Sequence, residues 1–166
     1  MLSSQSFTLN RRLIIAISAA AFLSACATVE KPVSLADTLA KTPELSTLNG
    51  LVKTAGLTET LQGAGPFTIF APNDAAFKAL KAGTIEDLSK NPSKLKDLIT
   101  YHGIAGNVMA KDVKNSSVKA LNGDSLAVSK AGEFVTVENA MVVKADVMAS
   151  NGVIHIVDTV MTPPKK

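Results

Sequence analysis

The stretch GPFTIFAPNDAAFKAL, residues 65–80, carries the signals of a strand, a sharp corner and a helix in close succession. Its first half is a short aromatic and β-branched run, which favours a strand packed on at least one face. Pro72 stops that strand, and Asn73 or Asp74 can cap the helix that follows. The helix has apolar residues at helical spacing: Ala76, Phe77 and Leu80.

A second apolar run, NGVIHIVDTVMTP at 151–163, lies near the C-terminus. Its Val and Ile content predicts a strand, which we expect to be the partner of the first one. Between the two runs the period of the pattern changes. Helical spacing dominates up to Tyr101 and His102, and short Val- and Ile-rich segments separated by glycine turns follow.

Particular boundaries follow from these patterns. Ser34 is expected to cap a first helix, Gly56 to end a second that starts near Pro43, and Thr84 with Asp87 to form a capping box. Asn91 followed by Pro92 predicts the start of a longer helix. The expected strands are 117–121, 125–129, 134–137, 141–147 and 153–160. A helical half followed by a strand-rich half indicates an α+β fold.

The first 25 residues are interpreted as a lipoprotein signal peptide. Arg11 and Arg12 precede an apolar run at 13–22, which is too short to span a bilayer, and the segment ends in LSAC at 23–26. This ending resembles a bacterial lipobox, in which Cys26 is acylated and becomes the first mature residue. The alternative is an ordinary cleaved signal peptide with an incidental cysteine. We expect 26–34 to be a lipidated tether, 35–163 the folded domain and 164–166 a C-terminal tail.

Composition excludes several classes of protein. Removal of Arg11 and Arg12 with the leader leaves 15 basic against 14 acidic residues, a formal charge of +1. The mature part has no Arg or Trp, so it lacks the clustered charge and stacking rings expected of a nucleic-acid-binding protein. Nucleophile-elbow, phosphate-loop and H-E-x-x-H motifs are also absent from the sequence, so we expect no enzyme and no cofactor.

Four segments together resemble the fasciclin-type domain family: FTIFAPNDAAF at 67–77, Tyr101-His102, the turn at 121–123 and the C-terminal run. The motif positions are Phe70, Ala71, Pro72, Asn73, Asp74, Phe77, Asn151, Gly152 and His155. The resemblance covers 35–163 and implies a wedge of mainly antiparallel β-sheet flanked by several short helices. It also implies binding and adhesion.

In animal members of this family an Asp-Ile pair and a Tyr-His region contribute to integrin adhesion. The matching positions here are Asp146, Val147, Tyr101 and His102, which the resemblance makes candidate partner-binding residues. The sequence departs from the family pattern at Val147, and again at Lys144-Ala145, where a Glu-Pro pair is common.

Structural roles compete with functional ones at several residues. His155 and His102 are expected to make hydrogen bonds in the core or at a helix end, and two histidines with one cysteine cannot build a typical zinc site. Asn73 and Asp74 are expected to form a turn and a cap rather than a metal site. Four methionines are expected to fill gaps in the core: Met109, Met141, Met148 and Met161.

Two functions therefore remain open for a protein at the bacterial cell envelope, facing the periplasm or the cell surface. The first is a lipid-anchored module for adhesion to a protein or glycan. The second is a carrier of a hydrophobic small molecule such as a carotenoid, which some family members bind. The carrier would need exposed apolar side chains between helices and sheet, for which the candidates are Leu57, Leu61, Val108 and Met109.

Overall fold

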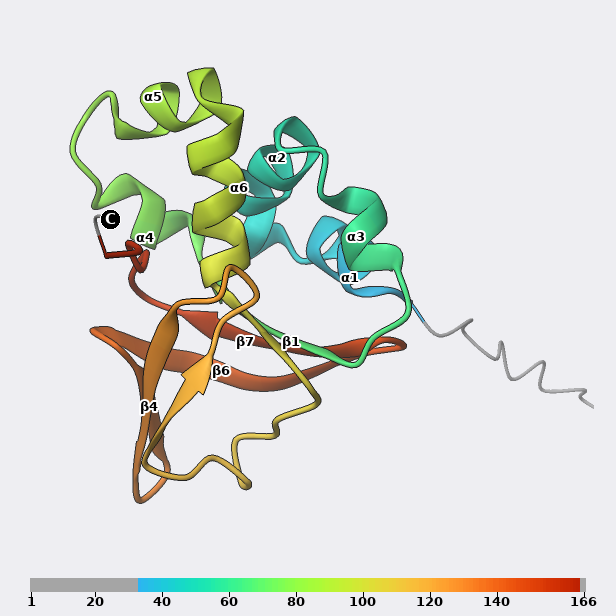
Figure 1. Ribbon diagram of the computed structural model, residues 1–166, viewed down its shortest axis with the longest axis vertical. Coiled ribbons are helices and arrows are strands. Elements are labelled where there is room, and N and C mark those ends of the chain that lie inside the picture. Colours follow the sequence, from blue (N-terminus) through green and yellow to red (C-terminus); the bar gives the residue numbers. More distant parts are fainter. Residues whose placement is uncertain (1–32, 165–166) are drawn as a thin grey trace, which may run out of the picture.

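A layer of short helices covers one face of a bent seven-stranded sheet in the computed structural model, which describes residues 33–164 (Figure 1). The strands, in sheet order, are β2 (Gly103–Ala105), β1 (Phe67–Pro72), β7 (Gly152–Val157), β6 (Ala140–Ala149), β5 (Phe134–Val137), β4 (Ser125–Ala131) and β3 (Ser116–Lys119). The expected signal peptide, Cys26 and the last two lysines lie outside the described residues. The predicted α+β class is confirmed.

Helices fill most of the first half of the described chain, as the periodicity predicts. They are α1 (Leu35–Lys41), the 3-10 turn η1 (Pro43–Leu45), α2 (Ser46–Thr54), α3 (Thr58–Gln62), α4 (Asp74–Lys78), α5 (Thr84–Lys90) and α6 (Pro92–Tyr101). Asn91 is the N-cap residue of α6, as predicted. The expected capping box at Thr84 is wrong, because Gly83 occupies the N-cap position with φ 87°, a conformation that glycine adopts without strain.

The two apolar runs of the sequence are neighbours at the centre of the sheet. β1 pairs in parallel with β7, from Phe67 opposite Gly152 to Pro72 opposite Val157, which confirms the expected partnership. On its other side β1 pairs antiparallel with β2, a strand that the sequence pattern does not indicate. All other strand pairs are antiparallel.

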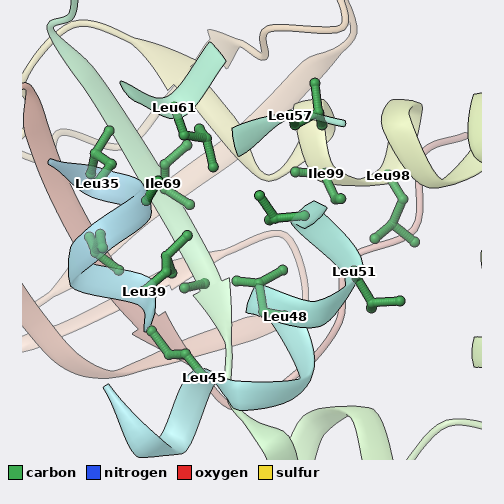
Figure 2. Packing of buried hydrophobic residues seen from close by; sticks show 14 of the residues in the cluster. Leu35, Leu39, Leu45, Leu48, Leu51, Leu57, Leu61, Ile69, Leu98 and Ile99 are labelled. Carbon is green, nitrogen blue, oxygen red and sulfur yellow. The ribbon is translucent and has the colours of Figure 1, made fainter. Parts of the chain in front are cut away.

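Alternate residues of the central strands enter two separate cores. Ile69 of β1 and Ile154 of β7 face the helices and join a cluster of leucines from α1, α2, α3 and α6. Figure 2 shows this packing, with Ile69 between Leu35 and Leu39 on one side and Leu48 on the other. Phe70 of β1 points the other way, into a second cluster inside the bent sheet. The central strands are therefore buried on both faces.

The bend of the sheet is located in β6, the longest strand. Its register with β7 shifts between Val142 and Lys144 and again between Lys144 and Val147, and such irregularities increase local bending. The two edge strands then meet. Ile104 forms a bridge with Ala120, and the Leu121 N–H donates to the Gly103 carbonyl at 2.8 Å. The sheet thus closes into a wedge at this point.

At the corner after β1, Asn73 and Asp74 are both candidates for the cap of α4, and only Asn73 caps it. The Asn73 side chain accepts the Ala76 N–H at 2.7 Å and is the N-cap of α4. Asp74 instead accepts hydrogen bonds from the Ser46 hydroxyl at 2.6 Å and the Thr47 N–H at 2.9 Å. Burial acts to raise the pKa of the Asp74 carboxyl, but these hydrogen bonds outweigh it and lower that pKa. This aspartate joins α2 to α4.

Candidate interaction surfaces

His102 is buried at the end of α6, with 2% of its surface exposed. Its Nδ1–H donates to the Leu98 carbonyl at 2.7 Å, and its Nε2 accepts the Met161 N–H at 3.0 Å. Burial lowers the pKa of His102 from 6.5 to about 4, against the opposing effect of the Leu98 hydrogen bond. A neutral ring with both nitrogens occupied fits the structural role predicted for it.

Tyr101 is 3% exposed and belongs to the core inside the wedge. Burial raises the pKa of its hydroxyl, and the charges of Glu138 and Asp124, with a hydrogen bond to Glu138, act in the same direction. The expectation that Tyr101 and His102 contribute to partner binding stays a prediction. Both side chains are almost fully buried, and their polar groups have partners within the chain.

His155 holds a loop against the inside of the wedge. Its Nε2–H donates to the Val108 carbonyl at 2.8 Å, its Nδ1 accepts the Asp146 N–H at 3.2 Å, and its ring stacks on Phe70 at 5.5 Å between centroids. Burial lowers the pKa of His155, while the hydrogen bond to Val108 and the charge of Asp146 oppose that shift. These contacts to backbone are the structural role predicted for this histidine.

Asp146 lies at the bend of β6 with φ 56°, a left-handed conformation that Asp and Asn tolerate better than most residues. Its Oδ1 accepts the Ala110 N–H at 2.9 Å. Thr68 fixes the same loop from β1, because its hydroxyl donates to the Gly106 carbonyl and accepts the Val108 N–H. Asp146 is half-buried, and its carboxylate accepts a hydrogen bond from within the chain. A role in partner binding stays a prediction.

Val147 follows Asp146 and is also half-buried, packed against the helix-side core. The two neighbouring side chains therefore point to opposite sides of β6. Asp146 points toward the loop that contains Ala110, and Val147 points toward the helices. Both residues therefore make structural contacts within the domain at the bend of β6.

Asn151 joins three segments at the end of the β6–β7 hairpin. Its Oδ1 accepts the Leu35 N–H, and its Nδ2 donates to the carbonyls of Leu61 and Gly63, each at 2.8 Å. Gly152 beside it lies against β1, where a Cβ would overlap the Phe67 carbonyl. Both residues of this motif are thus required for packing.

The outer face of β4, β5 and β6 exposes large apolar side chains to solvent. Phe134 is 65% exposed, Val143 50% and Met141 40%. Strand alternation places uncharged residues at the outward positions around them: Ala127, Ser129, Ala131 and Thr136. The expectation that Met141 fills the core is therefore wrong, and so is that for Met148, which is 58% exposed, whereas Met161 is buried. The sequence could not identify this face, because both faces of these strands are largely apolar or small.

The residues proposed for a carrier groove do not form one. Leu57 and Leu61 are 4% and 5% exposed within the helix-side core, whereas Val108 packs on the opposite side of the sheet. A hollow of about 180 Å³ opens inside the wedge between Phe70 and Val113. This volume is below the roughly 300–1,000 Å³ typical of ligand sites. The groove expected between helices and sheet is thus replaced by packed leucines.

Two further properties of residues 33–164 bear on function. Within this range no three His, Cys, Asp or Glu side chains are grouped so that they could hold a metal ion. In the same part of the chain every helix is too short or too polar to cross a bilayer.

Comparison with known proteins identifies similar chains. The model of the Fasciclin domain family matches residues 43–163. Protein sll1483 of Synechocystis sp. is 42% identical over 140 residues, which cover 83% of this chain and 78% of that protein. The cell surface glycolipoprotein MPB83 of Mycobacterium bovis is 35% identical over 127 residues, covering 74% of this chain and 57% of the relative.

Among solved structures, the fold is similar to that of a FAS1 domain pair from the insect cell adhesion molecule Fasciclin I. The TM-score is 0.65 with 18% sequence identity, and the match covers 79% of this chain and 51% of that one. This likeness concerns the fold, including the helices that cover one face of the sheet.

Proposed function

Because the chain belongs to the fasciclin domain family, we propose that it is a lipid-anchored module of the bacterial cell envelope that acts by binding a surface protein. Fasciclin domains are linked to adhesion and to cell-surface proteins, and relatives of this chain include a bacterial cell surface glycolipoprotein. In this proposal the protein is an interaction module and carries out no catalysis.

Attachment to the membrane is assigned to Cys26. The LSAC ending at 23–26 follows a leader of the length and charge expected of an exported lipoprotein, and Cys26 is the only cysteine of the chain. Several acyl chains on one residue anchor a protein stably, since each buried methylene contributes about 0.8 kcal/mol. The variant Cys26→Ser should fold normally but fractionate away from membranes.

The observation that carries the binding proposal is the outer face of β4, β5 and β6. Phe134, Val143 and Met141 are exposed on a face whose outward positions in β4 and β5 carry no charge, with Lys144 next to Val143 in β6. Aromatic residues and methionine are enriched in protein interfaces, and charged residues are depleted at their centres. This composition favours a protein partner, and contiguous exposed apolar surface is characteristic of such sites.

The proposal can be tested by adhesion of protein-coated beads to cells of the native host. The double variant Phe134→Ser, Val143→Ser should lose most of the retention of the beads, because the centre of the face becomes polar. Met148→Ser is the matched control, since it removes an equally exposed apolar side chain at the other end of β6. Equal retention of all three proteins, with unchanged unfolding midpoints, would exclude this face.

The carrier alternative is tested separately on protein released from the membranes of its host. Visible absorbance, or a stoichiometric extra mass in a native mass spectrum, would favour a bound hydrophobic molecule. The packing of Leu57 and Leu61 in the core argues against the groove expected for it. Protein without colour or added mass is the result that the binding proposal requires.

A further inference from the structure

Three segments without charged residues meet at one end of the wedge. They are 62–66, before β1, 105–107, after β2, and 148–152, the turn from β6 to β7, here together called the tether end. Each lies in a longer uncharged run of sequence: 60–73, 98–110 and 147–157. Fourteen acidic and 17 basic residues occur elsewhere in the chain, so an end composed of three such segments is unusual for a surface.

Backbone and side-chain hydrogen bonds hold the tether end together. The Gly106 N–H donates to the Pro66 carbonyl at 2.9 Å, and the Phe67 N–H donates to the Asn151 carbonyl at 3.1 Å. Asn151 also binds the Gly63 carbonyl. The three segments line one surface hollow of about 550 Å³. They therefore form a continuous, ordered surface.

Apolar side chains are accessible on this surface. Met148 is 58% exposed, and Ala64, Pro66 and Ala105 are exposed beside it in the same segments. The exposed polar residues of the tether end, including Asn107 and Ser150, are neutral. Such a surface can enter the headgroup region of a bilayer without removing a charge from water, which is the most costly step of that transfer.

The described chain starts at this same end. The Ser150 N–H donates to the Val33 carbonyl at 2.8 Å, and Leu35 is bound by Asn151. Figure 1 shows the β6–β7 turn beside the beginning of α1. Val33 lies seven positions after Cys26, and a fully extended chain of that length reaches about 25 Å. An acyl anchor on Cys26 therefore keeps the tether end near the bilayer.

We propose that the tether end lies against the bilayer that holds the acylated Cys26, with Met148 in contact with lipid. This inference rests on the proposed lipidation of Cys26 and adds an orientation to it. Met141 and Met148 lie near opposite ends of β6, at most about 23 Å apart along the strand, so contact at Met148 places the outer face of β4, β5 and β6 away from the bilayer. The domain thus contacts the membrane at two points, the acyl chains on Cys26 and the tether end.

The test uses the full acylated protein in vesicles of phosphatidylethanolamine and phosphatidylglycerol. Met148→Cys and, as the matched control, Met141→Cys each introduce an exposed thiol, which is labelled with an environment-sensitive fluorophore. Because Cys26 is the only native cysteine, one label per chain is expected if its sulfur is acylated. Two labels per chain, or failure to float with the vesicles, would exclude the lipid anchor itself and with it this inference.

On protein that carries one label and floats, lipid contact is read by quenching with brominated phospholipid. The probe at 148 should shift to shorter wavelength and be quenched several-fold more than the probe at 141. Equal, weak quenching of both probes would overturn the orientation while leaving the anchor intact. A blue-shifted probe at 148 without lipid quenching would also overturn it, because contact with a second protein copy would then cover this end.

Discussion

His102 and Met161, 59 positions apart, are joined by a buried hydrogen bond from the Met161 N–H to Nε2 of the imidazole, 3.0 Å long. The bond connects the end of α6 to the segment that follows β7. It requires the neutral ring with its proton on Nδ1, which Leu98 accepts. The fold therefore disfavours protonation of His102, and the stability of the protein should depend on pH.

We expect the free energy of unfolding to fall between pH 7 and pH 5. The pKa of His102 is about 4 in the folded chain and 6.5 when exposed, so in this window the unfolded state binds more protons. Linkage then predicts a loss of about 2 kcal/mol from His102 alone. His155 adds to the loss in the same direction, since its pKa is also lowered.

Urea unfolding at a series of pH values measures this loss. Above pH 5 the loss of stability comes from the histidines, because the carboxylates titrate in more acid solution. The stabilising contribution of Asp74, whose pKa is lowered, is lost only there. A proton NMR titration provides the control. If the folded His102 ring titrated near its ordinary pKa, the explanation would be wrong.

Substitutions of Asp146 should separate its structural role from the predicted partner role. Asp146→Asn keeps an oxygen for the Ala110 N–H and tolerates φ 56°, so stability should change by less than about 0.5 kcal/mol. Asp146→Val loses the hydrogen bond and strains the backbone, at a cost of about 2–3 kcal/mol. Thermal unfolding of the parent protein, Asp146→Asn and Asp146→Val measures these differences in stability.

Adhesion of the same variants then tests the charge. If Asp146 contacts a partner through its negative charge, the Asn variant should bind less while remaining as stable as the parent. Undiminished binding by Asp146→Asn would restrict this residue to its role in holding the 106–110 loop.

Two glycines should respond to alanine in opposite ways. Gly152→Ala places a methyl group on the Phe67 carbonyl of the neighbouring strand and should destabilise the protein by about 3 kcal/mol or prevent folding. Gly50→Ala, in exposed helical backbone of α2 with open space around the new atom, should stabilise it by about 0.5–1 kcal/mol. Chemical denaturation of both variants measures these changes in the free energy of unfolding. An unchanged stability of Gly152→Ala would contradict the close approach of β1 and β7.

Asn151 should not tolerate a carboxylate. In Asn151→Asp the two N–H donors to the Leu61 and Gly63 carbonyls are lost, and a negative charge faces two carbonyl oxygens. We expect a loss of about 3 kcal/mol at neutral pH, recovered in part below the pKa of the new carboxyl group. Asn151→Ser, which can keep a single bond, is the control; an equal loss for both variants would exclude the charge as the cause.

Local signals in the sequence predicted the central strands and several helix ends well. The proline that ends β1, the Asn73 cap and the apolar spacing of α2 and α6 each act within a few residues, so their effect is visible in the pattern. β2 escaped prediction because it is only three residues long and its Gly103 and Ala105 are poor strand formers. Pairing with β1 and the bridge to Ala120 hold it extended.

The candidate surfaces were less predictable for a related reason. Tyr101 and His102 have polar groups that suit either a surface or a core, and the partner that decides for His102, Met161, lies far along the chain. Phe134 and Val135 are both apolar, so alternation alone does not tell which of them faces water. The pairing of β5 with its neighbours settles it in the folded chain, where Val135 enters the core inside the wedge and Phe134 remains outside.

The parallel pair of β1 and β7 also constrains when this protein can fold. β1 is complete after Pro72, but its parallel neighbour begins at Gly152, so the middle of the sheet cannot form until almost the whole domain has been made available. A chain that passes through an export channel as an extended polymer benefits from that delay. In the export proposed for this chain, the connectivity of the sheet would disfavour compaction before transport, and folding would be completed once β7 has emerged.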